Sequence, residues 1–132
     1  RLIRSLQEEM NMAVVLITHV FGVVAEVSDS VAVMYGGRVV EYGTTRDIFK
    51  NHKHPYVEGL KECIPRPDEL REELAVIPGS VPNAAELPAG CPFEPRCPKA
   101  MEQCRTVMPG YTHIAGRHKV RCLLYGEGVG AL

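Results

Sequence analysis

The first twenty residues carry a helical hydrophobic pattern followed by an extended one. Residues 2–12 have apolar side chains at positions 2, 3, 6, 10 and 12, a spacing that predicts an amphipathic helix, and Asn11 suits its end. Residues 13–18 are apolar and largely β-branched, which predicts a strand covered on both faces of a parallel sheet. His19 follows this strand directly, at the end where side chains point into the cleft above such a sheet.

A short helix and a tight hairpin are predicted next. The segment Phe21–Val27 is short, apolar and compatible with a helix. Two strand-like segments, Ser30–Tyr35 and Arg38–Tyr42, flank Gly36-Gly37. This glycine pair predicts a two-residue turn, because both turn positions need a positive φ.

Helix-start motifs follow the hairpin. Thr44 and Asp47 have the spacing of a capping box, which predicts a short helix that ends by Lys50. Pro55 suits the first turn of a second helix, which is expected to run to about Cys63 and to stop before the next proline.

Proline punctuates the chain after residue 64, and helical patterns largely fail there. Short elements are nevertheless expected: one acidic helical turn in Pro67–Leu74, an ordered turn in Ile77–Asn83, a short helix in Cys97–Val107, and strands in Tyr111–Ile114 and Lys119–Leu124. The glycine-rich end, Gly126–Leu132, is expected to fray.

Charge and composition exclude several classes of partner. The net charge of −1 provides no electrostatic attraction to nucleic acid or to an anionic membrane surface. No apolar run is long enough for a membrane-spanning helix, so contact with a membrane is expected only through a partner protein. Five cysteines in a chain without a secretory signal favour metal binding or redox chemistry over a disulfide framework.

Four of the cysteines form the candidate metal site. Cys91, Cys97, Cys104 and Cys122 are separated by 5, 6 and 17 residues, wider gaps than the close pairs typical of structural zinc. A cubane iron–sulfur cluster is larger than one ion and accepts ligands from separate turns, so it suits these gaps better. Zinc, disulfides and free thiols remain alternatives, since a region with a small core needs some cross-link. Cys63 lies outside this group and is expected to be a plain buried residue.

Charged and histidine residues near the cysteines have simpler expected roles. Arg96 and Arg121 each precede a cysteine, where they could balance thiolate charge. His52 and His54 are expected on a solvated loop. His118 is close enough in sequence to Cys122 to replace a cysteine ligand, but a surface position is favoured.

The region from Ala13 to Gly43 resembles the end of the nucleotide-binding domain of ABC-transporter ATPases. In that family a strand followed by a histidine forms the switch region, as residues 13–19 do here. The family's last hairpin is matched in order and spacing by Asp29-Ser30, Val31–Tyr35, Gly36-Gly37-Arg38 and Val39–Gly43.

Later motifs resemble the C-terminal extension of the ATPases of bacterial oligopeptide, dipeptide and nickel importers. The motifs are His54-Pro55-Tyr56, Ile77-Pro78-Gly79 with Val81-Pro82, and Cys91-Pro92-Phe93-Glu94-Pro95-Arg96-Cys97. The resemblance implies an α/β fold, with the C-terminal remnant of a P-loop NTPase in residues 1–50 and a small, irregular cysteine- and proline-rich extension in residues 51–132. It also implies a [4Fe–4S] cluster in some members, which here would be held by the four cysteines.

The resemblance gives His19 a catalytic role in a longer parent ATPase. There the histidine would hydrogen-bond the γ-phosphate of ATP, bound with Mg²⁺, and help to orient the attacking water. The family usually has Asp at the next position, where this chain has Val20, so slower or altered hydrolysis is expected. This chain has no G-x-x-x-x-G-K-[ST] phosphate loop and no acidic strand end before His19, so it is expected to be a C-terminal part that does not itself hydrolyse ATP.

The implied parent drives peptide or nickel import from the cytoplasmic face of the bacterial cell membrane. Its partners would be a second ATP-binding subunit and the membrane-spanning permease subunits, with no nucleic acid. A competing hypothesis is a non-enzymatic metal- or iron–sulfur-binding module that regulates transport or contacts a second subunit, and a third is a redox sensor. Because residues 13–18 lack partner strands in this chain, the isolated chain is expected to self-associate.

Overall fold

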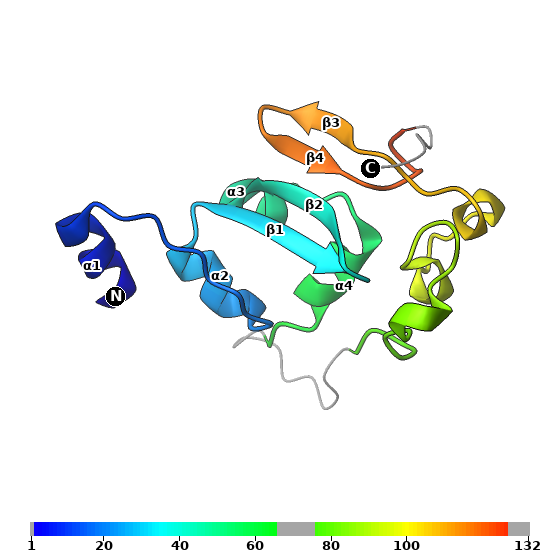
Figure 1. The fold of residues 1–132 in the computed structure, drawn as a ribbon, viewed down its shortest axis with the longest axis horizontal. Coiled ribbons are helices and arrows are strands. Elements are labelled where there is room, and N and C mark those ends of the chain that lie inside the picture. The colour runs from blue at the N-terminus through cyan, green and yellow to red at the C-terminus, as the bar shows by residue number, and fades with distance from the viewer. Residues whose placement is uncertain (1, 66–75, 127–132) are drawn as a thin grey trace.

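A computed structural model describes residues 2–65 and 76–126, in which short helices accompany one antiparallel sheet and the N-terminal helix lies apart from it (Figure 1). The helices are α1 (Leu2–Met10), α2 (Phe21–Val27), α3 (Thr45–Lys50) and α4 (Pro55–Glu62). The strands are β1 (Ser30–Tyr35), β2 (Arg38–Thr44), β3 (Thr112–Ala115) and β4 (His118–Val120), and 3₁₀ turns occupy η1 (Ala84–Glu86), η2 (Glu94–Arg96) and η3 (Glu102–Arg105). The structure therefore combines helices with a sheet, which is consistent with the predicted α/β class. The predicted turn of helix in Pro67–Leu74 and most of the predicted frayed end lie outside the described residues.

The β1–β2 hairpin forms as its sequence predicts. Side chains along β1 alternate between exposed and buried, and Val31, Val33 and Tyr35 face the core. This alternation is typical of an antiparallel strand with one covered face. Gly36 and Gly37 both have positive φ, 56° and 75°, which fits the primed turns that join such strands.

The sheet joins two hairpins that are far apart in the sequence. Its strand order is β1-β2-β4-β3, and β4 pairs with β2 through Glu41 opposite Val120 and Tyr42 opposite Lys119. Figure 1 shows the β3–β4 hairpin lying beyond β2. The two C-terminal strands were predicted at nearly these positions. However, β4 already ends at Val120, and the chain then leaves the sheet towards Cys122.

Local capping explains where α3 and α4 begin. The backbone N–H of Asp47 donates to the Thr44 hydroxyl at 3.2 Å, and the Thr44 N–H donates to the Asp47 carboxylate at 2.9 Å. The predicted capping box is therefore confirmed. Pro55 occupies the first turn of α4, as predicted, and His54 is its N-cap.

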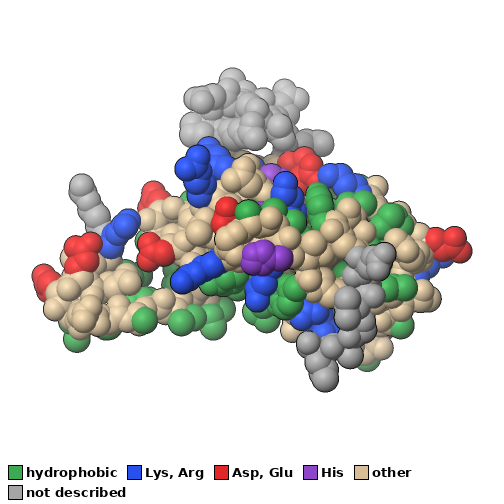
Figure 2. Space-filling model, turned by 90° about the horizontal axis from the view of Figure 1, so that it is seen from above, with side chains coloured by type: hydrophobic (Ala, Val, Ile, Leu, Met, Phe, Trp, Pro, Cys, Tyr) green, Lys and Arg blue, Asp and Glu red, His purple; other side chains and the backbone are tan. Residues whose placement is uncertain are grey.

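The predicted strand at residues 13–18 does not form, and this expectation was wrong. The segment has no regular secondary structure, and the side chains of Val15 and Ile17 are 89% and 94% exposed. A central strand of a parallel sheet exists only when neighbouring strands supply its hydrogen bonds, and the described residues provide none. Figure 2 shows the resulting row of exposed hydrophobic side chains along the N-terminal arm, at the left of the view.

A second prediction is only partly fulfilled. Residues 97–107 were expected to form a short helix, but the structure has only the single 3₁₀ turn η3 there. The backbone groups of this segment are used elsewhere, because the carbonyls of Cys104 and Arg105 accept hydrogen bonds from Cys91 and Gly90. None of the described helices is long and apolar enough to cross a membrane.

The core lies between the β1–β2 hairpin, the helices α3 and α4, and the cysteine-bearing loops. Ile48 and Val57 have no exposed surface, and Phe93 is 1% exposed. The Phe93 ring packs edge-on against Tyr35 with a centroid distance of 5.1 Å. Phe93 thereby anchors the segment that follows Cys91 onto the sheet. The cysteine region and the hairpin therefore share one core.

Candidate functional site

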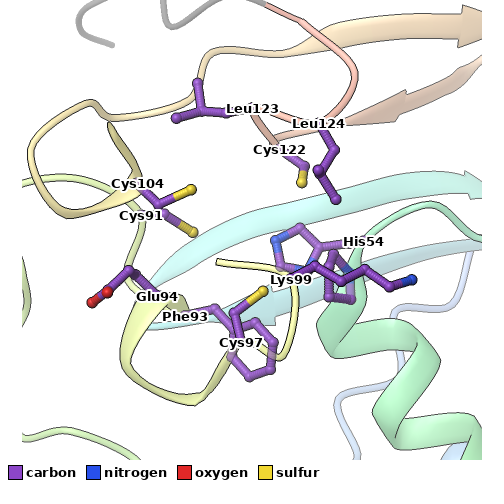
Figure 3. Close-up of a pocket in the computed structure, with 11 residues that line it drawn as sticks. His54, Cys91, Phe93, Glu94, Cys97, Lys99, Cys104, Cys122, Leu123 and Leu124 are labelled. Carbon is purple, nitrogen blue, oxygen red and sulfur yellow. The ribbon is translucent and has the colours of Figure 1, made fainter. Parts of the chain in front are cut away.

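The four candidate cysteines line a single cavity. Its other lining residues are His54, Pro55, Phe93, Glu94, Lys99, Leu123 and Leu124. We call this space the cysteine cavity. Figure 3 shows the sulfur atoms of Cys91, Cys97, Cys104 and Cys122 directed towards a common centre from separate parts of the chain. The sequence predicted these residues as a group, and the structure brings all of them together.

A close contact between two backbone segments places Cys91 beside Cys104. The N–H of Cys91 donates to the carbonyl of Cys104 at 2.8 Å, and the N–H of Gly90 donates to the carbonyl of Arg105 at 3.0 Å. A Cβ atom on Gly90 would lie 2.2 Å from the Cys104 carbonyl oxygen. Glycine is therefore required at position 90 for the two segments to approach this closely.

Cys97 and Cys122 reach the cavity from two other directions. Cys97 follows η2, and the preceding Arg96 donates to the carbonyls of Ile77 and Pro78 at 3.1 and 3.0 Å. These hydrogen bonds hold the start of the predicted Ile77–Asn83 turn against η2. Cys122 follows β4, and the N–H of Arg121 donates to the carbonyl of Val40 at 2.8 Å, so the sheet fixes where the chain turns towards the cavity.

Each of the four sulfur atoms has a backbone N–H group nearby. The N–H of Met101 donates to the sulfur of Cys104 at 3.4 Å. Backbone hydrogen bonds also reach Cys91 from Phe93, Cys97 from Lys99, and Cys122 from Leu124. N–H groups aimed at sulfur favour the thiolate and stabilise metal-bound sulfur.

For Cys91, Cys97 and Cys122, burial has the opposite effect on the thiol pKa and dominates over the N–H groups. It raises the pKa of Cys91 to about 11 and also raises the pKa values of Cys97 and Cys122, and the neighbouring cysteines add to the effect. In the absence of a cation these three thiols are therefore protonated at neutral pH. A bound cation would have to displace the protons, which couples binding to pH.

His54 closes the side of the cavity nearest α4. Its ring is 1% exposed, and its Nδ1 accepts the N–H of Tyr56 at 3.0 Å. Burial lowers the pKa of His54 to about 4, so the imidazole is neutral at physiological pH. The expectation that His54 lies on a solvated loop was wrong, because its backbone is drawn into the core by Glu41.

Glu41 is a buried acceptor shared by three parts of the chain. Its carboxylate has no exposed surface and accepts the N–H groups of Lys53 and His54, both at 2.8 Å. It also accepts the Nε2–H of His118 at 2.6 Å. His118 is 2% exposed, so the expectation of a surface position was wrong as well, and its ring is bound to Glu41 instead of lining the cavity.

The arginines next to the cysteines do not serve the thiols, contrary to expectation. Neither Arg96 nor Arg121 lines the cavity, and the Arg121 guanidinium stacks on the Tyr111 ring at 3.9 Å. The basic residue at the cavity is Lys99, whose ammonium group is bound to Glu58 at 2.6 Å. His54, Glu94 and Lys99 are the polar lining residues to which the sequence assigned no role at this site, and folding brings them to the thiols.

The remaining site predictions have different outcomes. All five cysteines are free thiols, and Cys63 is half-buried rather than buried.

Among residues 2–65 and 76–126, no three His, Cys, Asp or Glu side chains lie close enough together to hold one metal ion. His19 is exposed on the N-terminal arm, and it is not among the residues that line the cavity.

Comparisons with known proteins agree on one family. A model of the family described as "Oligopeptide/dipeptide transporter, C-terminal region" matches residues 40–104. The oligopeptide transport ATP-binding protein OppD of Salmonella typhimurium is 48% identical over 116 residues, which cover 88% of this chain and 35% of that protein.

Two relatives from Bacillus subtilis extend the match over nearly the whole chain. The oligopeptide transport ATP-binding protein AppD is 50% identical over 127 residues, and the dipeptide transport ATP-binding protein DppD is 46% identical over 126 residues. Each match covers 96% of this chain and 38% of the relative, so the chain spans well under half the length of these relatives. The chain therefore belongs to the family of oligopeptide and dipeptide transport ATP-binding proteins, and its match to the family model lies in their C-terminal region.

Proposed function

We propose that this chain is the C-terminal part of the ATP-binding subunit of a bacterial peptide importer. The observation that carries the proposal is the 46–50% identity to oligopeptide and dipeptide transport ATP-binding proteins over 88–96% of the chain. On this proposal, residues 1–50 are the end of a P-loop ATPase domain and residues 51–132 are the family's extension. The sheet pairing between β2 and β4 then attaches the extension to the ATPase domain.

In the proposed parent protein, His19 is the switch histidine that contacts the γ-phosphate of Mg²⁺-bound ATP. An exposed imidazole on an extended arm supports this role, because the side chain is available to a nucleotide held by other parts of the ATPase. The test is steady-state ATP hydrolysis by the parent protein with the upstream phosphate loop that the proposal requires. His19→Ala should reduce kcat strongly, whereas an unchanged kcat would contradict the role.

Val20 provides a second test of the same region. If the usual Asp at this position supports the switch, Val20→Asp should raise or alter the rate of hydrolysis by the parent. A rate that is normal for the family and unchanged in Val20→Asp would show that the substitution is tolerated.

The proposed parent works at the cytoplasmic face of the bacterial cell membrane. Its partners are a second ATP-binding subunit, with which it closes on ATP, and permease subunits that carry the peptide or nickel. The exposed row that includes Val15 and Ile17 supports contacts with further ATPase structure. We also propose that the isolated 132-residue chain self-associates through this row, and a monomer by light scattering would contradict that.

We further propose that the cysteine cavity holds a [4Fe–4S] cluster, with Cys91, Cys97, Cys104 and Cys122 as its ligands. Four thiols around one cavity and an N–H group at each sulfur support this assignment. Apolar side chains from Phe93, Leu123 and Leu124 form part of the lining.

Zinc is supported less well than the larger cluster. A single Zn²⁺ needs sulfur atoms within about 2.3 Å of one point. No described group of three donors is close enough for one ion. A bound cluster would supply one-electron redox chemistry, through which the extension could regulate transport. Iron, sulfide and zinc analysis of anaerobically purified protein distinguishes these possibilities.

A further inference from the structure

The imidazole of His54 contains a buried hydrogen-bond donor that the fold leaves without a partner. Its Nδ1 accepts the N–H of Tyr56 at 3.0 Å, which leaves no proton on Nδ1. The ring proton of the neutral imidazole therefore resides on Nε2. Among the described residues Nε2 has no hydrogen-bond partner, although the side chain is only 1% exposed.

The acceptors that line the cavity with His54 are the four sulfur atoms and the Glu94 carboxylate, and the carboxylate is already bound to Arg105 at 3.2 Å. His54 lines the cysteine cavity together with all four cysteines, and Figure 3 shows a ring nitrogen on the side facing them. The ammonium group of Lys99 is a donor and is already bound to Glu58. The Phe93 ring, with its centroid 5.8 Å from that of His54, is at most a weak acceptor.

Hydrogen bonds hold both the backbone and the ring of His54. The His54 N–H donates to Glu41 at 2.8 Å, its carbonyl accepts the N–H groups of Val57 and Glu58, and its Nδ1 caps α4. The ring cannot turn Nε2 away without losing the cap. A buried donor without an acceptor is costly, so a fixed one indicates an acceptor that arrives from outside the chain.

We propose that His54 donates its Nε2–H to an anionic sulfur of the group held by the four cysteines, as a positioning residue and not as a ligand. The inference rests on the proposed [4Fe–4S] cluster. A hydrogen bond to a thiolate or sulfide stabilises the more negative, reduced form and raises the reduction potential. Direct coordination by Nε2 would require the proton to move to Nδ1, which faces the N–H of Tyr56.

Two substitutions separate the cap from the donor. In His54→Asn the amide oxygen can replace Nδ1 as the helix cap, while the donor at the Nε2 position is lost. In His54→Gln the amide nitrogen can replace the Nε2–H, while the cap is lost. His52→Asn is the matched control, because His52 is a nearby half-buried histidine that does not line the cavity.

The experiment is anaerobic reconstitution of the full chain with ferrous iron and sulfide, followed by redox titration with dithionite. His54→Asn should make the reduction potential more negative by about 59 mV, which is about a tenfold shift of the one-electron equilibrium towards the oxidised form. His54→Gln and His52→Asn should stay close to the wild type. A fully loaded His54→Asn with the wild-type potential would overturn the inference, and so would equal loss of cluster in both His54 variants.

A second measurement does not need the cluster. In the iron-free chain labelled with ¹⁵N-histidine, NMR should find the proton of His54 on Nε2, and a proton on Nδ1 would overturn the donor role. Failure of the proposed function gives a different result, since the wild type itself would then take up no iron and sulfide. That result would contradict both the proposed cluster and the role of His54. If the wild type does take up iron and sulfide, the variants test the role of His54 alone.

Discussion

Removing the carboxylate of Glu41 should destabilise the whole described fold. In Glu41→Ala the N–H groups of Lys53 and His54 and the Nε2–H of His118 lose their acceptor at once. All three groups converge on a carboxylate with no exposed surface, so water replaces it poorly. The substitution therefore affects β2, the start of α4 and β4 together.

The size of the effect follows from the number of donors. A buried donor left without a partner costs about 1 to 3 kcal/mol, and breaking a buried charged interaction costs about 3 to 5 kcal/mol. We expect Glu41→Ala to lower the free energy of unfolding by roughly 3 to 5 kcal/mol, a large part of a typical total of about 5 to 15. With a urea slope of about 1 to 3 kcal/mol per molar, the midpoint should fall by at least about 1 M.

The assay is urea unfolding of the iron-free chain, followed by circular dichroism. Glu62→Ala is the matched control, because Glu62 ends α4 on an exposed surface and should change the free energy by less than about 0.5 kcal/mol. Glu41→Gln should fall between the two, since its amide keeps one acceptor oxygen but turns an NH₂ group towards donors. A free energy of unfolding for Glu41→Ala within about 0.5 kcal/mol of the wild type would show that the Glu41 carboxylate does not hold these elements together.

Three further substitutions test separate features of the chain. Gly90→Ala should lower the free energy of unfolding by about 1 to 3 kcal/mol and reduce iron uptake, because the added Cβ would lie 2.2 Å from a backbone oxygen. The control Gly22→Ala should be neutral or stabilising, because no atom lies within 4 Å of the added Cβ. Hydrogen bonds from Thr44 lower the pKa of Asp47 in the folded state from 3.8. Asp47→Asn should therefore destabilise the chain above pH 3.8, and the difference from the wild type should vanish as the pH falls through the lower folded-state pKa. Cys97→Ser should abolish the visible iron–sulfur absorption while the secondary structure of the iron-free chain stays unchanged.

Each of these predictions has a clear contrary result. Equal stability and iron content in Gly90→Ala and Gly22→Ala would show that the close backbone approach is unimportant for the site. A stability difference for Asp47→Asn that persists well below pH 3.8 would exclude ionisation as its cause. Full iron content in Cys97→Ser would remove Cys97 from the ligand set.

Local elements were predicted from the sequence because their causes are local. The β1–β2 turn depends on the positive φ of Gly36 and Gly37, and α3 depends on the exchange of hydrogen bonds between Thr44 and Asp47. In both cases the residues that decide the structure lie within four positions of one another. The same reasoning located α2, α4 and the β3–β4 hairpin to within a few residues.

The errors concern contacts between distant parts of the chain. His54 and His118 resemble surface histidines in sequence, and only the fold brings them to Glu41, 77 positions before His118. Residues 13–18 have the composition of a central strand, but none of the described strands pairs with them. The cysteines could be grouped by residue type, whereas their common cavity and the His54 donor depend on β2–β4 pairing and on the Gly90 contact.

Anaerobic purification of the wild-type chain, with a visible absorption spectrum and analysis of iron, sulfide and zinc, is the most direct test of the cysteine cavity. We predict equal amounts of iron and sulfide, about four of each per chain, with the broad visible absorption of an iron–sulfur cluster. Stoichiometric zinc without iron, or a metal-free chain with all four thiols free, would contradict it.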